Sequence, residues 1–583
     1  MPKRTDLKIP YGVSDFKTIR NDGLYYVDKT SYLALMESRD RFVFFVRPRR
    51  FGKSLFLSMI ESYYDLNQKK DFKRLFGGLW LGAHPTENAN RFMTLKLDFS
   101  KVGGTGETLE QAFEQHISWR VDDFVARYPD ICDSRFMNGY ASRNAAGKVD
   151  AIVSQARRTG IPLYLIIDEY DNFTNQLIRA TGVNDYRDIT HGTGFYRNWF
   201  KKFKGDFDRI FMTGVSPVTL DDLTSGFNIA TNLTLDSDFN AALGFSEAEV
   251  LQMYRDFKGT GKFTKGDPAE IVKSIKPWYD GYCFAEEKVG EECVFNSDMT
   301  LYHLKNLVAK GEPPKNMVDP NIKTDYDKLK TISDLQRVIF KMDPVEALPM
   351  TEQTVTTGGV QFSLVESFPA EAIIQPENFH SLFFYYGLLA MSDRKMGDIV
   401  FSVPNACVEK QIFGYLRKQY FPPEKSFIEW SAAARAFAYE GKWREFFELV
   451  SENFAETTPI RGNISGEVRL QGYFQCEMGH LPQFITCPEL EMAHGNCDFF
   501  LFPERTYYGD APHSYIVEFK HVKKGAKKTE LDAQRKEGIA QLKNYAKDKK
   551  IPALAKGTTL HLVLVQYRGP KMANCELVGE RKY

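Results

Sequence analysis

The stretch "FVFFVRPRRFGKSLFLSM", residues Phe42–Met59, decides the fold. It opens with a continuous apolar run rich in β-formers, which is typical of a strand buried on both faces of a parallel sheet. After Lys53 the apolar residues recur at helical spacing, so a tight turn joins a strand to a helix. Backbone N–H groups at such a helix start attract phosphate, and the sequence therefore predicts a phosphate-binding loop.

The residues of this turn suit a nucleotide bound with a divalent cation. Gly52 lets the backbone approach the phosphates, Lys53 supplies a positive charge, and the Ser54 hydroxyl is a Mg²⁺ ligand. The loop reads R-P-R-R-F-G-K-S where the usual pattern is G-x-x-x-x-G-K-[ST], so Arg47 occupies the position of the first glycine. Because arginine is more restricted in φ than glycine, we expect the loop entrance to differ from the usual geometry.

Two more apolar runs extend the predicted sheet and end in polar residues. In residues 161–173, Asp168 would hold Mg²⁺ through water and Glu169 would polarise the attacking water; a polar loop after a core strand is the alternative. In residues 208–218, Thr213 is either a γ-phosphate sensor or part of a Thr-Gly turn. All three residues belong at the carboxyl ends of strands, where α/β sheets bind ligands.

The order of predicted elements indicates an α/β protein of four parts. Alternating strands and helices predict a P-loop NTPase sandwich over residues 1–240, followed by a helical lid over 241–340. A helix and two short strands make 341–430 winged-helix-like; such a region binds DNA or serves as a rigid coupler, and we favour the coupler. Residues 431–583 are expected to form a C-terminal α/β domain.

A second chemical site is predicted in that C-terminal domain. The runs 495–502 and 514–522 are expected to be neighbouring strands, and side chains alternate across a strand, so Glu518 and Lys520 share a face. With Asp498 on the adjoining strand, the two carboxylates would hold Mg²⁺ or Mn²⁺ for phosphodiester cleavage, and Lys520 would steady the nucleophile or the developing charge. A surface hairpin with charges on its wet side is the alternative.

Six motifs occur along the chain in the order "IPYGVSDFKTIRNDGLYYVDKT", "RPRRFGKSLFLSM", "LIIDEYDNF", "FMTGVSPVTLDDLTSGFN", "LGFSEAEV" and "WYDGYCF". In these the chain resembles the AAA-ATPase-like family, whose members often carry a C-terminal PD-(D/E)XK nuclease-like domain. The resemblance implies that Lys53, Ser54, Asp168 and Glu169 bind and hydrolyse ATP. It also implies that arginine in place of the first glycine is a family habit.

Arg50 and its neighbour Arg49 have two readings. Either side chain adds charge near the phosphates or is exposed to solvent, and we assign Arg50 to nucleotide binding.

The end of the chain resembles the PD-(D/E)XK domain, of restriction-endonuclease-like fold, that such ATPases carry. Gln541 and Tyr545 lie four residues apart on one helix face, a Q-x-x-x-Y pattern similar to the helix after the catalytic strand of RecB-like nucleases. The resemblance implies that both join the catalytic site, and that Glu467 and Glu491 are further acids near it. "GNCD" stands where relatives show "GRxD", so one basic phosphate contact is missing at Asp498.

Charge and composition limit the partners of the chain. Lys plus Arg and Asp plus Glu both number 76, so no global field predicts nucleic acid, but residues 520–550 hold eleven basic and four acidic residues. That excess is a solvated helix face or a nucleic-acid surface. No apolar run approaches membrane-spanning length and no secretory signal opens the chain, so we expect a cytoplasmic protein without a membrane partner, or a nuclear one in a eukaryote.

Cysteines predict little further chemistry. Cys476, His480, Cys487 and Cys497 lack the usual zinc spacing, so packing is favoured over a zinc site.

Together, these features predict ATP binding and hydrolysis coupled to metal-dependent cleavage of nucleic acid, DNA in preference to RNA. A homo-oligomer stays open. The alternative is an ATP-driven molecular switch whose nuclease-like domain binds nucleic acid or protein without cutting.

Overall fold

A computed structural model of the chain divides into two compact units. The first comprises Met1–Ile322, Lys330–Met342 and Gln361–Asn405, and the second Lys323–Leu329, Asp343–Val360 and Ala406–Tyr583. The domain boundaries predicted at residues 240, 340 and 430 stay predictions. The residues that the structure describes are 7–103, 108–171, 194–217, 230–322, 359–368, 372, 375–412, 427–457, 470, 473–474, 477–479, 481–492 and 495–583.

A parallel sheet forms the centre of the first unit, as the sequence predicts. Its strand order is β2-β3-β4-β1-β5, and each neighbouring pair is parallel. Because the pairing brings Val46 beside Gly214 and Asp98 beside Asp168, the carboxyl ends of the four longer strands gather at one edge. The strands are β1 (Phe42–Val46), β2 (Met93–Asp98), β3 (Leu163–Asp168), β4 (Arg209–Gly214) and β5 (Thr231–Asn232).

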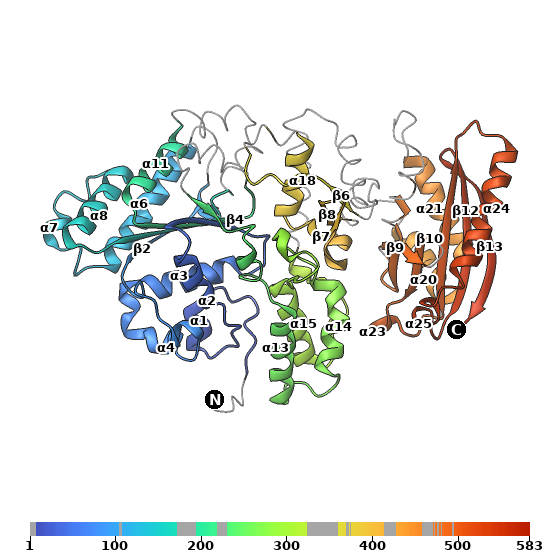
Figure 1. Ribbon diagram of the computed structural model, residues 1–583, viewed down its shortest axis with the longest axis horizontal. Helices are drawn as coiled ribbons and strands as arrows, with labels where there is room; N and C mark the ends of the chain where they lie inside the picture. Colours follow the sequence, from blue (N-terminus) through green and yellow to red (C-terminus); the bar gives the residue numbers. More distant parts are fainter. Residues whose placement is uncertain are drawn as a thin grey trace. The chain divides into compact units, whose positions relative to one another are not determined.

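Helices cover both faces of this sheet (Figure 1). One set packs through α3 against β2 and β3, and comprises α1 (Phe16–Asn21), α2 (Ser31–Glu37), α3 (Lys53–Tyr64), α4 (Phe72–Phe76) and α5 (Trp80–Ala83). The other set packs through α6 against β2, and comprises α6 (Leu109–Arg127), α7 (Ser134–Met137), α8 (Ala145–Thr159) and α11 (Phe195–Asp206).

Three helices follow the sheet in the region where the sequence predicts a lid. They are α13 (Glu247–Gly259), α14 (Pro268–Tyr279) and α15 (Ser297–Lys310). The predicted capping box is present, because the Ser246 side chain accepts from the Glu249 N–H while the Glu249 carboxylate accepts from the Ser246 N–H.

The next described segment contains the predicted helix and hairpin. These are α18 (Pro376–Tyr385), β7 (Ala390–Lys395) and β8 (Asp398–Ser402), and β6 (Val360–Gln361) completes a small sheet of order β6-β8-β7. Met396 and Gly397 make the two-residue turn with φ angles of 56° and 94°, the left-handed values that tight hairpins require.

The second unit contains a mixed sheet of order β13-β12-β11-β10-β9, in which only β11 and β12 are parallel among the described strands. Its strands are β9 (Phe484–Met492), β10 (Gly495–Pro503), β11 (His513–Val522), β12 (Thr559–Arg568) and β13 (Lys571–Lys582). Its helices include α20 (Phe427–Glu440), α21 (Trp443–Thr457), α23 (Arg505–Tyr508), α24 (Lys528–Tyr545) and α25 (Ile551–Leu554).

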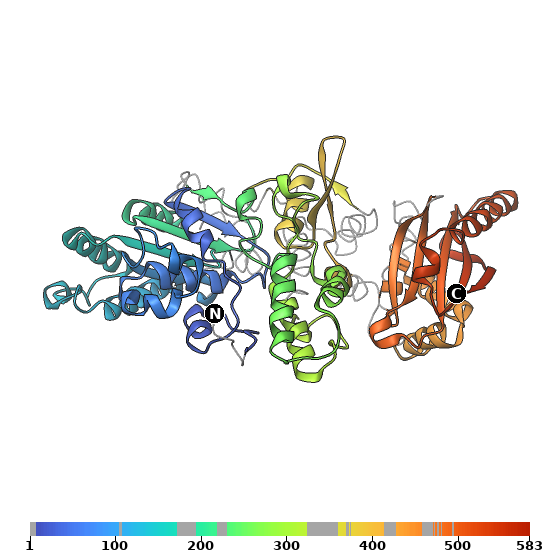
Figure 2. The same cartoon turned by 60° about the horizontal axis from the view of Figure 1, so that its bottom comes forward.

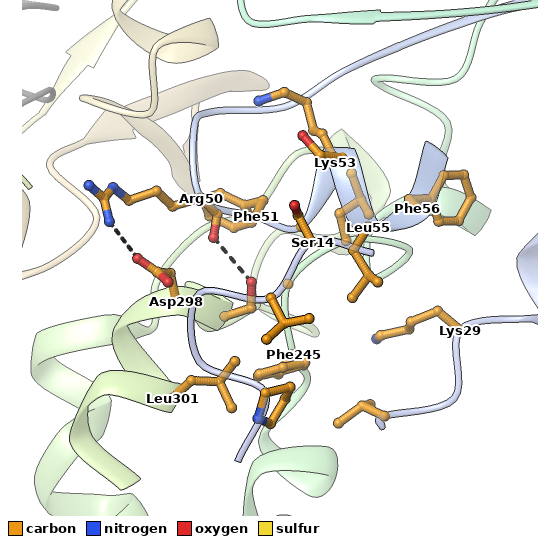
Figure 3. A pocket seen from close by; sticks show the side chains of 18 of the residues that line it. Ser14, Lys29, Arg50, Phe51, Lys53, Leu55, Phe56, Phe245, Asp298 and Leu301 are labelled. Atoms are coloured by element: carbon orange, nitrogen blue, oxygen red, sulfur yellow. Dashed lines mark hydrogen bonds and ion pairs between the residues drawn. The ribbon is translucent and has the colours of Figure 1, made fainter. Parts of the chain in front are cut away.

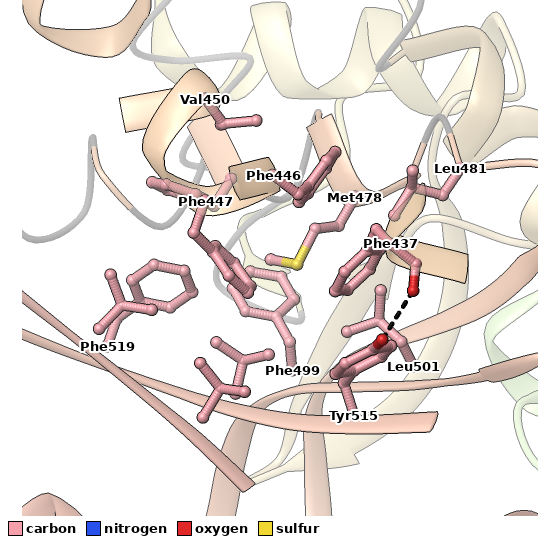
Figure 4. Close-up of a cluster of buried hydrophobic side chains, with 14 of the residues drawn as sticks. Phe437, Phe446, Phe447, Val450, Met478, Leu481, Phe499, Leu501, Tyr515 and Phe519 are labelled. Atoms are coloured by element: carbon pink, nitrogen blue, oxygen red, sulfur yellow. Dashed lines mark hydrogen bonds between the residues drawn. The ribbon is translucent and has the colours of Figure 1, made fainter. Parts of the chain in front are cut away.

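The two faces of this mixed sheet are covered by different helices (Figure 2). Val517 and Phe519 of β11 face an aromatic cluster with α20 and α21, where Tyr515 stacks on Phe437 at 4.1 Å between ring centroids (Figure 4). Ile516 faces the opposite way, into a cluster with Leu542 of α24. Alternation therefore directs the even-numbered side chains of β11 toward α24.

Candidate functional site

The predicted phosphate loop lies between β1 and α3. α3 begins at Lys53, and its N-cap is Gly52 with φ 93°, a left-handed value that favours glycine. Arg50 also has positive φ, at 69°. The turn therefore brings the backbone N–H groups at the start of α3 to the carboxyl edge of the sheet, where a phosphate would meet them.

Arg47, the departure from the usual motif, points into the protein. Its side chain is 1% exposed and donates hydrogen bonds to the carbonyls of Val46, Thr234 and Phe239. The guanidinium also lies 4.1 Å from the ring centroid of Phe284, and burial lowers its pKa to about 9. The residue in place of the first glycine thus anchors the loop entrance to distant parts of the same unit.

The residues predicted to bind and hydrolyse ATP lie together at the sheet edge. The Lys53 amine donates to the carbonyls of Arg47 and Pro48 at 2.9 and 3.0 Å, so it is held over the loop. The Ser54 hydroxyl lies 3.5 Å from the Asp168 carboxylate. Burial raises the pKa of Asp168 to about 6, and the nearby Lys53 opposes that shift. A cation at this position would offset the desolvation of the carboxylate.

Two other predicted residues have partners within the protein. The Arg50 guanidinium lies 2.6 Å from the Asp298 carboxylate of α15 and donates to the Asn321 carbonyl at 2.7 Å. The Thr213 hydroxyl is 1% exposed and donates to the Phe45 carbonyl at 2.6 Å. Their roles toward a nucleotide stay predictions.

Asp171 is a residue of this site that the sequence analysis did not assign. It is 2% exposed, and its carboxylate accepts from the backbone N–H groups of Val215 and Ser216, which follow β4. Burial raises its pKa to about 6. A Cβ at Gly214 would lie 2.3 Å from its oxygen, so only glycine fits there. The last acid of "DEYD" was the available signal, and its carboxylate connects the segment after β3 to the end of β4.

A pocket of about 390 Å³ opens beside the loop (Figure 3). Its lining includes Lys53, Ser54 and Glu169 on the loop side and apolar side chains such as Val13 and Phe245 on the other. Lys29, a further residue that the sequence analysis did not single out, is 8% exposed and pairs with Glu249 at 2.7 Å. The N-terminal segment and helix α13 are therefore tied together at this pocket.

The predicted catalytic residues of the second unit converge on the α24 face of the mixed sheet. The Asp498 carboxylate accepts from the Phe519 N–H at 2.6 Å, and the Lys520 amine lies 3.1 Å from the Glu518 carboxylate. Glu518 is 3% exposed, and burial together with the charge of Asp498 raises its pKa to about 8. Its Oε2 atom is buried without a hydrogen-bond partner, so a cation would fit beside it.

Helix α24 adds three side chains around this centre. The Gln541 Oε1 atom is buried without a hydrogen-bond partner, and the Tyr545 hydroxyl donates to the Asn496 carbonyl at 2.8 Å. Glu537, which the sequence analysis did not assign, lies 3.9 Å from the Lys520 amine. It precedes Gln541 by four residues, so the same helical stripe that predicted Gln541 and Tyr545 could have identified it.

The remaining predicted ligands are not placed beside these groups. Glu467, Cys476 and His480 lie outside the described residues, as does the side chain of Glu491. In the described parts of the chain, no three His, Cys, Asp or Glu side chains are grouped so that they could hold a metal ion. Cys487 and Cys497 are free thiols. Any metal at the second site would therefore rest on two described carboxylates.

Comparisons with known proteins place two families on the chain. Residues 10–224 match the family model described as "Predicted AAA-ATPase", and residues 470–576 match the "PD-(D/E)XK nuclease superfamily". A protein of Azotobacter chroococcum mcd 1, described as "Uncharacterized protein in vnfD 5'region", is 26% identical over 295 residues, 48% of this chain and 50% of that protein. The chain thus spans about half the length of that curated relative.

A solved structure, "Structure of the Aeropyrum Pernix ORC2 protein (ADPNP-ADP complexes)", matches with 10% identity and a TM-score of 0.28. The match covers 67% of this chain and 92% of that one. No helix within the described ranges has both the length and the apolar character that a bilayer crossing needs. The chain thus contains a predicted AAA-ATPase-like domain over residues 10–224 and a domain of the PD-(D/E)XK nuclease superfamily over residues 470–576.

Proposed function

We propose that the first unit binds and hydrolyses ATP at the loop before α3. Lys53 would exchange its bonds to the loop carbonyls for the β- and γ-phosphates, and the apolar part of the pocket would receive the nucleoside. Ser54 and Asp168 would hold the Mg²⁺ that accompanies ATP. Glu169, on the pocket wall, would orient the attacking water.

We infer that the second unit cleaves phosphodiester bonds in nucleic acid, with DNA as the first substrate to test. The observation that carries this proposal is the buried, unpartnered Oε2 atom of Glu518 on one face with Asp498 and Lys520. A bound Mg²⁺ or Mn²⁺ would polarise the scissile phosphate and lower the pKa of a water molecule. Asp498 and Glu518 would hold it, and the Lys520 amine would steady the attacking oxygen.

α24 would complete this second site. Gln541 offers an unpartnered amide oxygen, which would orient the substrate or a water. Tyr545 would keep the Asn496 backbone, two residues before Asp498, in place. Gln541 would therefore act on the substrate or water, and Tyr545 on the backbone that carries Asp498.

The test uses the full chain and one change at each site. Asp498→Ala and Lys520→Ala should each abolish Mg²⁺-dependent cutting of DNA while ATP binding is unchanged. Lys53→Ala should lose ATP binding, measured by calorimetry. Cutting that survives both changes in the second unit would refute that site, and unchanged ATP binding in Lys53→Ala would refute the first.

An ATP-driven switch without cutting is the second candidate function. The contacts of Arg50 with Asp298 and with the Asn321 carbonyl favour this function. Through these contacts, a nucleotide bound in the phosphate loop would act on helix α15. Nucleotide-dependent association with DNA or protein, without cleavage under any divalent metal, would establish this function instead.

A further inference from the structure

One edge of the mixed sheet collects basic side chains from two chain segments. β11 and β12 run parallel, and their register pairs Val522 with Arg568, so both strands end at the same edge. Residues 521–529 and 568–573 include these strand ends and the turns after them, and they contain no Asp or Glu. We call their lysines and arginine the basic edge, which consists of Lys523, Lys524, Lys527, Lys528, Arg568 and Lys571.

The two segments of the basic edge touch each other. The Gly569 N–H donates to the Val522 carbonyl at 2.8 Å, and the Arg568 guanidinium donates to the Ala526 carbonyl. A Cβ at Gly569 would lie 3.1 Å from the Cβ of Lys524. The six cations are therefore held close together by the main chain of two neighbouring strand ends.

These cations are not neutralised within the described part of the chain. All six residues are exposed, and no described carboxylate lies within ion-pair distance of any of them. Along α24 the pattern differs, because Arg535 pairs with Glu576 at 2.5 Å. An ordinary solvated surface mixes both signs of charge. At the basic edge the six like charges repel one another, and a bound anion would relieve that repulsion.

The basic edge adjoins the proposed cleavage site. Lys523 follows Lys520 by three residues, which is about 10 Å along an extended chain. Successive phosphates of one strand advance by about 3.4 Å along a duplex axis, so the distance corresponds to roughly three nucleotide steps. A strand whose scissile phosphate lies at Lys520 would thus bring further phosphates to the basic edge.

We propose that the basic edge binds the phosphodiester backbone of the nucleic acid that the second unit cleaves. This proposal rests on the proposed nuclease function. Five of the six residues are lysines, whose ammonium groups bind phosphate as point charges. Contacts to phosphate carry no base information, so this binding is independent of sequence. The edge supplies positive charge beside a site whose acid, Asp498, is the last residue of "GNCD" and has no basic residue just before it.

The experiment measures how salt affects the binding of labelled oligonucleotides to the full chain in EDTA, where no cutting takes place. Lys523→Gln/Lys524→Gln removes two charges from the basic edge. Lys556→Gln/Lys582→Gln is the matched control, because both residues are exposed and Lys582 pairs with Thr559 at the opposite end of β12. The ten residues of β12 separate the two edges by about 30 Å.

The edge variant should flatten the slope of log K against log salt by about 1.8 on duplex and about 1.4 on single strands, and the control should leave it unchanged. DNA and RNA of one sequence, single and duplex, identify which backbone is preferred. Equal slopes for the edge variant and the wild type would overturn the proposal. Binding by the edge without any cutting in Mg²⁺ would refute the nuclease alone, whereas cutting with an unaltered salt slope would refute the basic edge alone.

Discussion

The guanidinium of Arg50 lies 2.6 Å from the carboxylate of Asp298, so the phosphate loop is tied to the first turn of α15. The Ser297 hydroxyl strengthens this contact by donating to the Arg50 carbonyl at 3.1 Å. Both charged side chains are only about one-fifth exposed, at 21% and 20%, so solvent weakens the pair less than at an open surface. Helix α15 and the loop are therefore expected to respond together when nucleotide binds.

Asp298→Asn should uncouple the phosphate loop from helix α15. We expect a loss of about 1–2 kcal/mol in stability, or roughly 2–4 °C in Tm, because Arg50 keeps its bond to Asn321 but loses its charge partner. The added stabilisation by ATP should also become smaller. Thermal unfolding with and without ATP measures both effects. Asp122→Asn on α6 is a control of the same chemistry, because Asp122 pairs with Lys148 at 2.7 Å and neither residue lines the pocket. An ATP-induced shift of wild-type size would contradict the coupling.

Arg47→Gly restores the usual first glycine of the motif, yet it should damage the protein. The change removes the hydrogen bonds to the Thr234 and Phe239 carbonyls and empties the space beside Phe284, at a cost of about 3–5 kcal/mol. Arg49→Gly, two residues further on and only half-buried, should cost far less. Denaturant unfolding monitored in the first unit compares the two; tighter ATP binding by a fully stable Arg47→Gly protein would show that the arginine is not an anchor.

What the sequence predicted well depends on local pattern. The apolar run and the helical period fixed β1 and the start of α3, and strand alternation placed Glu518 and Lys520 opposite Val517 and Phe519. Alternation is a property of the backbone itself, so it holds wherever a strand forms. The sequence alone could therefore predict on which face of the sheet each proposed catalytic residue of β11 lies.

What could not be predicted depends on partners far away in the chain. Arg47 has its acceptors at Thr234 and Phe239, and Arg50 pairs with Asp298. No local period reports such contacts, so an arginine in a phosphate loop reads equally well as a phosphate ligand or a structural anchor. Glu537 is the opposite case. Its spacing from Gln541 could have predicted that both lie on one helix face, but no local pattern could have predicted its ion pair with Lys520.

His303 predicts how the first unit responds to acid. It is 2% exposed, its Nδ1 atom lies 2.7 Å from the Tyr254 hydroxyl, and burial lowers its pKa to about 3. The pKa of this histidine in the unfolded chain is about 6.5. Between that pH and the folded-state pKa, the imidazole is protonated in the unfolded state and stays neutral in the folded state. Stability is therefore lost as pH falls from about 6.5 toward 3, by up to about 1.4 kcal/mol per pH unit from this residue.

His303→Gln should reduce that slope, since glutamine keeps an acceptor for Tyr254 and does not titrate. Unfolding by denaturant at several pH values between 4 and 7 measures the slope. His84→Gln, at an exposed position, is the matched control and should leave the slope as it is. An identical acid dependence in His303→Gln and wild type would show that other groups account for the acid lability.

The two acids that flank Lys520 should differ sharply in importance. Glu518 is 3% exposed and carries the unpartnered Oε2 atom, whereas the Glu537 side chain is 62% exposed and lies 3.9 Å from the same amine. An exposed ion pair contributes little, so Glu537→Gln should change the rate of Mg²⁺-dependent cutting by less than about fivefold. Glu518→Gln should reduce it at least about 100-fold, because it replaces the buried carboxylate that we propose as a metal ligand. Single-turnover cleavage measures both variants, with circular dichroism to verify the fold. If Glu537→Gln were the more harmful change, the metal-binding acid would have to lie on α24, and the proposed roles of β10 and β11 would be wrong.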